Sequence, residues 1–190
     1  MDFTRAKDLV KENVKYIVIH HTASNATLEQ IQQHALNIGW LGAGYNEFID
    51  KKGKRTKVRG NKVGAHTLGH NEISYGIALQ GNMENEESTK EQWEALITAV
   101  IEAKQKYKSA EIVGHRNLTA TLCPGKNINI EKLIKDIEKT ENIKKHWAEK
   151  HYNSLIAKGI VIHEKRYDDN LTRGEIFALL DRFEKYLRGD

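Results

Sequence analysis

Short runs rich in β-branched residues alternate with amphipathic stretches along the first 137 residues of this 190-residue chain. Residues 16–22 form the clearest run and predict a buried strand, and residues 74–80 and 111–115 have a similar character. Two amphipathic stretches, at residues 88–104 and 130–137, have the apolar spacing of helices that pack on a sheet. Strands that alternate with helices predict an α/β fold, with a mixed central sheet flanked by helices.

Capping residues indicate where two of these helices begin. Thr27 is followed by Gln30, and Ser88 by Glu91, and both pairs have the spacing of a capping box. Between the two helices, residues 60–73 read as one long loop. Loops of that length in a compact domain are commonly functional, so we expect this loop to border a site.

The character of the sequence changes after about residue 139. Residues 139–145 are polar and typical of a linker, and two further helical stretches follow them. We therefore expect two domains, at residues 1–139 and 140–190. A piece of roughly 50 residues is marginal as an independent domain, so the second should pack on the first or on another copy of itself.

Charge and composition exclude several classes of protein. The net charge is +4, which favours anionic partners, but basic and acidic residues are interspersed and no nucleic-acid-binding signature is present. No apolar run approaches the roughly 20 residues of a membrane span. The N-terminus lacks the basic start and apolar stretch of a signal peptide, so we expect synthesis in the cytoplasm. One cysteine cannot form an internal disulfide.

That cysteine, Cys123, has neighbours that point to a metal. It precedes Pro124, which favours an extended backbone, and His115 lies eight residues upstream. His20 ends the apolar run near the N-terminus. Two histidines and a thiolate give zinc three protein ligands and leave a fourth position for water, as in catalytic zinc sites. Taken singly, each motif also fits a buried core histidine or a small apolar cysteine.

The chain resembles the type-2 N-acetylmuramoyl-L-alanine amidases, the family of phage lysozyme-amidases and peptidoglycan recognition proteins. The matching segments run in the family's order between about residues 14 and 137. They are Val18-Ile-His-His-Thr-Ala, Gly44-Tyr-Asn, Val63-Gly-Ala-His-Thr-Leu-Gly-His-Asn, Ser74-Tyr-Gly-Ile, Gly114-His-Arg and Cys123-Pro-Gly. An ordered series of this kind is far more specific than any one of its members.

The resemblance implies a zinc hydrolase acting on bacterial peptidoglycan. His20, His115 and Cys123 fall on the family's zinc ligands. Tyr45 falls on the tyrosine that hydrogen-bonds near the water on the metal. Thr121 falls where relatives carry a residue that stabilises the developing oxyanion. The expected reaction is hydrolysis of the amide between N-acetylmuramic acid and L-alanine.

The resemblance also implies substrate-binding residues and includes one departure. His66 and Asn71 fall in the loop that borders the peptide groove, and His21 lies beside a ligand or lines that groove. Some bacterial relatives carry a general-base glutamate where this chain has Ala78. Either Tyr45 assists the water, which we favour, or another acid such as Glu47 does so.

The C-terminal region resembles a single S-layer homology repeat. It has a helix headed by Trp147, an exit at Gly159, and a second helix that begins at Thr172 with Glu175 as capping partner and Leu171 as a hydrophobic staple. The resemblance implies binding to anionic wall polymers. Such repeats usually occur in threes, so chains could associate into a homo-oligomer. Alternatively, the helices only stabilise the first domain, with Trp147 in a core instead of a polymer groove.

Together these features predict a wall amidase, either a phage endolysin or a host autolysin that lyses the cell wall. Two other classes stay open. Some members of the fold bind peptidoglycan without cutting it, although those usually lose the cysteine that is retained here. A wall-anchoring protein is the other alternative, but it does not explain the two histidines and the cysteine.

Overall fold

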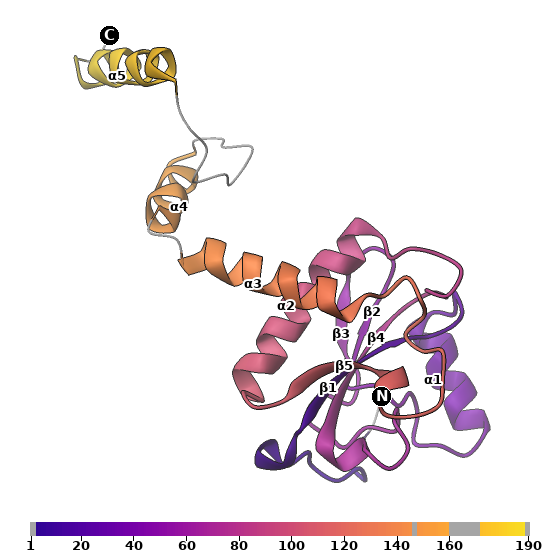
Figure 1. The fold of residues 1–190 in the computed structure, drawn as a ribbon. Coiled ribbons are helices and arrows are strands. Elements are labelled where there is room, and N and C mark those ends of the chain that lie inside the picture. The colour runs from indigo at the N-terminus through magenta and orange to yellow at the C-terminus, as the bar shows by residue number, and fades with distance from the viewer. Residues whose placement is uncertain (1–2, 146–147, 160–171, 189–190) are drawn as a thin grey trace. The chain divides into compact units, whose positions relative to one another are not determined.

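The computed structural model describes residues 3–145, 148–159 and 172–188 (Figure 1). The chain divides into two compact units, Met1–Lys139 and Thr140–Asp190. The expectations for Trp147 and for the staple residue Leu171 concern positions outside the described residues. None of the helices in the described part of the chain combines the length and the apolar character needed to cross a membrane.

A five-stranded mixed sheet forms the centre of the first unit, in the order β3-β2-β4-β1-β5. Its strands are β1 (Tyr16–His21), β2 (Glu47–Ile49), β3 (Arg55–Lys57), β4 (Ser74–Leu79) and β5 (Glu111–Gly114). β1 pairs in parallel with both β4 and β5, β2 pairs in parallel with β4, and only the β2–β3 hairpin is antiparallel. The predicted α/β fold with a mixed sheet is confirmed.

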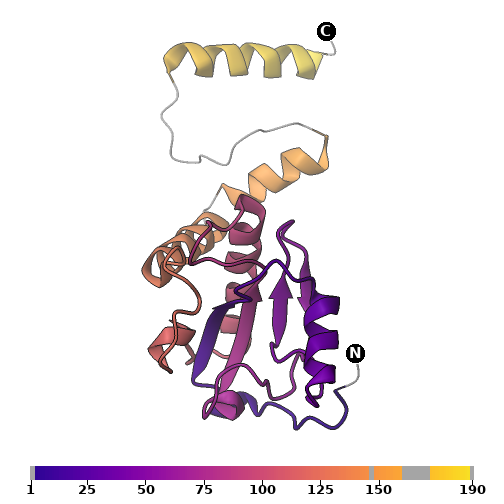
Figure 2. The same cartoon turned by 90° about the vertical axis from the view of Figure 1, so that its right-hand side faces the viewer.

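Both faces of the sheet are covered by helices, as Figure 2 shows. On one face, Leu96 and Val100 of α2 (Lys90–Lys106) and Leu133 of α3 (Ile130–Lys145) join the larger apolar core. On the other face, Leu28 of α1 (Leu28–Asn37) packs in a smaller cluster with Phe48 and Ala78. Because both faces of β4 are covered, all six of its residues are buried. Short 3-10 turns at Lys11–Asn13, Asn71–Ile73 and His115–Asn117 complete the unit.

The capping boxes of α1 and α2 explain where these helices begin. The Thr27–Gln30 box is present as predicted. The second box is formed by Thr89 and Gln92, so the prediction of Ser88 with Glu91 was wrong by one residue. The fully buried Gln92 donates from Nε2 to the carbonyl of Gln80 at 2.9 Å, and this tertiary contact sets the register of the helix start.

The predicted linker at residues 139–145 is helical, because α3 continues to Lys145. The segment is polar, but three of its seven residues are lysine and one is glutamate, and it contains neither glycine nor proline. Those residues have good helix propensity, and nothing in the segment interrupts the helix that precedes it. Polarity alone was therefore a poor indicator of a linker.

After the end of α3, the described residues of the second unit form two helices, α4 (Glu149–Ala157) and α5 (Arg173–Arg188). Gly159, with φ of +80°, follows α4 as predicted. The capping box of α5 is confirmed, since Thr172 N donates to Glu175 Oε2 at 2.8 Å and Glu175 N donates to Thr172 Oγ1 at 3.2 Å. Apolar side chains of α5 are 40–66% exposed, namely Ile176, Phe177, Leu179, Leu180 and Phe183.

The two possible α2 caps can be separated by mutation. Thr89 Oγ1 accepts from Gln92 N at 3.0 Å and donates to the carbonyl of Lys51 at 2.8 Å. We expect Thr89→Ala to lower the free energy of unfolding by about 1–2 kcal/mol, the usual cost of losing an N-cap. Ser88→Ala, the matched control, should change it by less than about 0.5 kcal/mol. Denaturant titration measures both, and a larger loss for Ser88→Ala would contradict this assignment.

Candidate active site

The strand order brings the two predicted histidines together. β1 and β5 are parallel neighbours with Ile19 opposite Gly114, so the next residues, His20 and His115, emerge at the same edge of the sheet. Their ring centroids are 4.6 Å apart. The loop that follows His115 then carries Cys123 back to them, and Cys123 Sγ lies 3.6 Å from His20 Nδ1. One ligand atom from each of the three residues lies within 4.8 Å of the others.

The separation of the sulfur from the first histidine fits a tetrahedral zinc ion. Zinc–sulfur and zinc–nitrogen bonds of about 2.3 and 2.0–2.1 Å at a tetrahedral angle require a sulfur–nitrogen separation of about 3.6 Å. The separation between Cys123 Sγ and His20 Nδ1 is 3.6 Å. A soft thiolate with two imidazoles is a donor set that suits zinc. The three residues could therefore hold such an ion and leave one position open.

Burial keeps all three donors electrically neutral in the absence of a cation. It raises the pKa of the Cys123 thiol to about 11. Burial, and then the neighbouring rings of His66 and His115, lower the pKa of His20 well below its usual value. The pKa of His115 is also lowered by burial. A divalent cation would reverse the preference of the thiol, because a coordinated cysteine is deprotonated.

The cysteine loop, residues 118–129, is pinned to the segment that follows β4. Gly125 has φ of +93°, and a Cβ there would lie 2.3 Å from the carbonyl carbon of Met83. Asn127 N donates to the Met83 carbonyl at 3.1 Å. From the other side, the Arg116 guanidinium donates to the carbonyls of Gly125 and Ile128 at 2.5 and 3.2 Å. Only a glycine allows this close approach, which sets the position of the sulfur.

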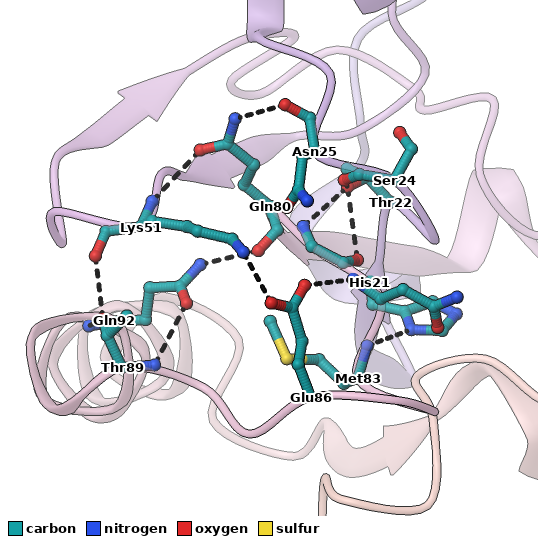
Figure 3. Close-up of polar contacts among 12 residues, drawn as sticks. His21, Thr22, Ser24, Asn25, Lys51, Gln80, Met83, Glu86, Thr89 and Gln92 are labelled. Carbon is teal, nitrogen blue, oxygen red and sulfur yellow. Dashed lines mark hydrogen bonds and ion pairs between the residues drawn. The ribbon is translucent and has the colours of Figure 1, made fainter.

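His21 braces the same region, as Figure 3 shows. Its imidazole Nδ1 accepts from Met83 N at 3.0 Å, and its backbone N–H points to Cys123 Sγ at 3.4 Å. The segment around Met83 is held in turn by Glu86, which accepts from Lys51 Nζ at 2.6 Å (Figure 3). The ring of His21 is therefore hydrogen-bonded to the protein backbone. The contact of His21 with the cluster is made by its own backbone N–H group.

Tyr45 lies beside the cluster, with its ring centroid 5.5 Å from that of His20. Burial, followed by the nearby Cys123, raises the pKa of its phenol to about 12. At neutral pH the hydroxyl is protonated, so it can donate to or orient a water molecule but is not a phenolate base. This position fits the alternative in which Tyr45, and not Glu47, assists the water.

Glu47 forms ion pairs away from the cluster. Its carboxylate is fully buried, accepts from Arg55 Nε at 2.6 Å and forms an ion pair with Lys57. It also accepts from Tyr75 Oη at 3.2 Å. Tyr75 belongs to the larger core on the α2 face, whereas Tyr45 packs against the smaller cluster on the α1 face. This acid therefore serves an ion-pair network on the opposite side of the sheet.

Thr121 is exposed and close to the sulfur ligand in sequence and in space. Its Oγ1 accepts from Cys123 N at 3.2 Å. A hydroxyl that accepts one hydrogen bond can still donate its own proton. The side chain is thus held in place by the cysteine loop while its donor stays available to a ligand.

His66 lies inside the protein beside the cluster, whereas Asn71 is half-buried and lines a surface pocket with Gly69, Glu72 and Ile73. His66 is 9% exposed, and its Nδ1 lies 3.0 Å from His20 Nε2. Burial lowers the pKa of His66 to about 3, so its ring is neutral. Asn71 Oδ1 accepts from the backbone N–H groups of His66 and Thr67, both at 2.9 Å. Asn71 thus holds the backbone that carries His66, and the substrate-binding role of both residues stays a prediction.

The chain belongs to the N-acetylmuramoyl-L-alanine amidase family, whose profile matches residues 10–126. It is 34% identical to peptidoglycan-recognition protein SC2 of Drosophila melanogaster, over 65% of this chain and 74% of that protein. It is 30% identical to the endolysin of Klebsiella phage KP32, over 60% of this chain and 82% of that protein.

Solved structures agree with this assignment. The N-acetylmuramoyl-L-alanine amidase LysC from Clostridium intestinale URNW superposes with a TM-score of 0.65 at 32% identity. The superposition covers 73% of this chain and 95% of LysC. The predicted family is thus confirmed, whereas the S-layer homology repeat stays a prediction.

Proposed function

We propose that this protein is a zinc-dependent N-acetylmuramoyl-L-alanine amidase of the endolysin type that acts on the bacterial cell wall. The observation that carries the proposal is the convergence of His20, His115 and Cys123, with one ligand atom of each within 4.8 Å of the others and Cys123 Sγ at 3.6 Å from His20 Nδ1. Membership of the amidase family supports the choice of bond, since the substrate of that class is the amide between N-acetylmuramic acid and L-alanine.

His20, His115 and Cys123 would hold the ion. When bound, zinc supplies Lewis acidity that makes water nucleophilic at neutral pH and polarises a carbonyl. Tyr45, protonated at neutral pH, orients the attacking water through its hydroxyl. Thr121 donates a hydrogen bond from its hydroxyl to the oxygen that becomes negative as the carbonyl carbon turns tetrahedral. The carbon–nitrogen bond then breaks, and the proton given up by the attacking water passes to the departing amine of L-alanine.

The alternative is a protein that binds peptidoglycan without hydrolysing it, since peptidoglycan recognition proteins are among the relatives. The retained cysteine and the half-buried Tyr45 beside the cluster favour hydrolysis. A binding protein needs neither a thiolate donor nor a phenol next to it. Both classes share the same bound polymer, so only product formation separates them.

Product analysis after digestion of purified peptidoglycan tests the proposal. The wild-type protein should release lactyl-bearing glycan and intact stem peptides with new alanine amino termini, detected by mass spectrometry. Cys123→Ser should reduce both the zinc content of the purified protein and the release of amino termini to background. Tyr45→Phe is the matched comparison. It should retain zinc and lose rate by about 100-fold or more, the scale of one positioned proton donor.

Two results would contradict the proposal. Undiminished cleavage by Cys123→Ser would remove zinc chemistry from the reaction. A wild-type protein that sediments with peptidoglycan but releases no amino termini would instead identify a binding protein.

The buried thiol predicts a specific pH dependence of zinc binding. The folded metal-free protein holds its Cys123 proton up to a pKa of about 11, while burial lowers the pKa of both histidines and so leaves their imidazoles neutral at about pH 8. Zinc should therefore displace one proton, and its apparent affinity should rise about tenfold per pH unit between about pH 7.5 and 9. Calorimetry at about pH 8 in buffers of different ionisation enthalpy counts the protons. Release of two or three would mean that the histidines are charged in the metal-free site.

We further propose that residues 140–190 attach the enzyme to anionic wall polymers and bring chains together. The proposal rests on the resemblance to an S-layer homology repeat, and the exposed apolar side chains of α5 supply a surface for association. A small helical unit that presents such a surface gains stability by covering it.

A shortened chain that ends at Lys145 tests the proposal without cutting α3. We expect it to hydrolyse soluble muropeptides at the wild-type rate but to sediment poorly with intact walls, and to elute as a monomer in size-exclusion chromatography. Equal sedimentation of the two proteins would show that the helices have only a stabilising role.

A further inference from the structure

His20 uses its two ring nitrogens in opposite directions. Nδ1 faces Cys123 Sγ at 3.6 Å, and Nε2 faces His66 Nδ1 at 3.0 Å. A neutral imidazole has one protonated and one unprotonated nitrogen, and only the unprotonated nitrogen can bind a metal. Nδ1 of His20 can therefore act as a ligand only when its proton is on Nε2. At a position as buried as this one, that N–H needs an acceptor.

The fold makes a slot for the acceptor. His66 reaches His20 by lying flat where the side chains of two glycines would otherwise be. A Cβ at Gly76 would lie 2.6–2.7 Å from three atoms of the His66 ring, and a Cβ at Gly64 would lie 2.3 Å from its Cδ2. Gly76 sits in the middle of the fully buried strand β4, where a glycine weakens the sheet. The ring of His66 gives a physical reason for both glycines.

Side chains around the slot set the orientation of the ring. Asn71 Oδ1 accepts the N–H groups of both His66 and Thr67, which anchors the backbone on which the ring is carried. Thr67 Oγ1 lies 2.9 Å from His66 Nδ1 and 3.5 Å from His20 Nε2. Among the described residues, His66 Nε2 has no hydrogen-bond partner of good geometry, although an interaction with the backbone of Ser74 favours a proton there. Nδ1 is then the accepting nitrogen.

We propose that His66 is the positioning residue of the metal centre: its Nδ1 accepts the Nε2–H of His20 and so presents His20 Nδ1, unprotonated, to zinc. This inference rests on the proposed function, because it takes His20 to be a zinc ligand. Carboxylates and backbone carbonyls commonly play this part for metal-bound histidines. Here a second, uncharged histidine does so, and the centre gains no additional negative charge.

Zinc affinity of the full-length protein, measured by competition with a chelator, tests the inference. His66→Leu removes the acceptor and should weaken zinc binding about 10- to 100-fold, the usual effect of losing such a partner. His66→Asn can place an amide oxygen near the position of Nδ1 and should recover most of that loss. His70→Leu, in the same loop, is the matched control and should bind zinc like the wild type, because the ring of His70 packs on Tyr16 instead of His20.

Two further measurements separate positioning from a merely structural role. Unfolding of the metal-free proteins shows how much stability each substitution removes. Gly76→Ala, which leaves every donor in place but intrudes on the slot, should weaken zinc binding as well. In the Co²⁺-substituted protein, His66→Leu should shift the visible ligand-field bands while the thiolate charge-transfer band from Cys123 persists.

The inference is overturned if His66→Leu binds zinc as tightly as the wild type, or if His66→Asn is as impaired as His66→Leu. A loss of metal-free stability with unchanged zinc affinity would also overturn it, since the role would then be packing alone. Failure of the wild-type protein to bind zinc would instead refute the proposed function, and this inference with it.

Discussion

The parallel pairing of β1 with β5 places His20 beside His115, and the rest of the centre is arranged around that contact. Carboxyl ends of parallel strands meet at one edge of a sheet, so two histidines far apart in the chain need no further device to come together. The other parallel neighbour of β1, β4, provides Gly76 and with it the space for His66. All residues of β1 after Tyr16 are buried, so the strand is covered on both faces.

Charge is distributed unequally over the two faces of the sheet. On the α2 face, the carboxylate of Glu47 is buried but paired with Arg55 and Lys57. The cluster on the opposite face comprises His20, His115 and Cys123, with no carboxylate among the three. Two permanent charges, the guanidinium groups of Arg59 and Arg116, act on His66 and Cys123 respectively, and burial favours the neutral forms of the three donors over charged ones. A cation that brings its own charge is then the partner that suits these residues, because it can turn the thiol into a thiolate.

Several features were predictable because they depend on residues that are close together in the sequence. The Thr27 and Thr172 capping boxes depend on residues three apart, and the strands depend on short apolar runs. The predictions that failed lacked such local determinants. The start of α2 was misplaced because Ser88 and Thr89 both suit a cap, and only the contact of Gln92 with Gln80 distinguishes them. Residues 139–145 were assigned to a linker by their polarity, although helices also tolerate polar residues.

The sequence by itself determined the family and the candidate ligands. The identities and order of His20, Tyr45, His115 and Cys123 match the amidase family before any coordinate is known, and two histidines with a cysteine are a donor set that suits a metal because donor chemistry belongs to residue types. Only the tertiary structure decided which other side chains contact them. His66 is 46 residues from His20 in the chain. Side chains alternate along β2, so Phe48 faces the side of the sheet that holds the cluster and the adjacent Glu47 faces the opposite side. Such relations depend on which strands become neighbours and on which face each side chain lies, and no short stretch of sequence specifies either.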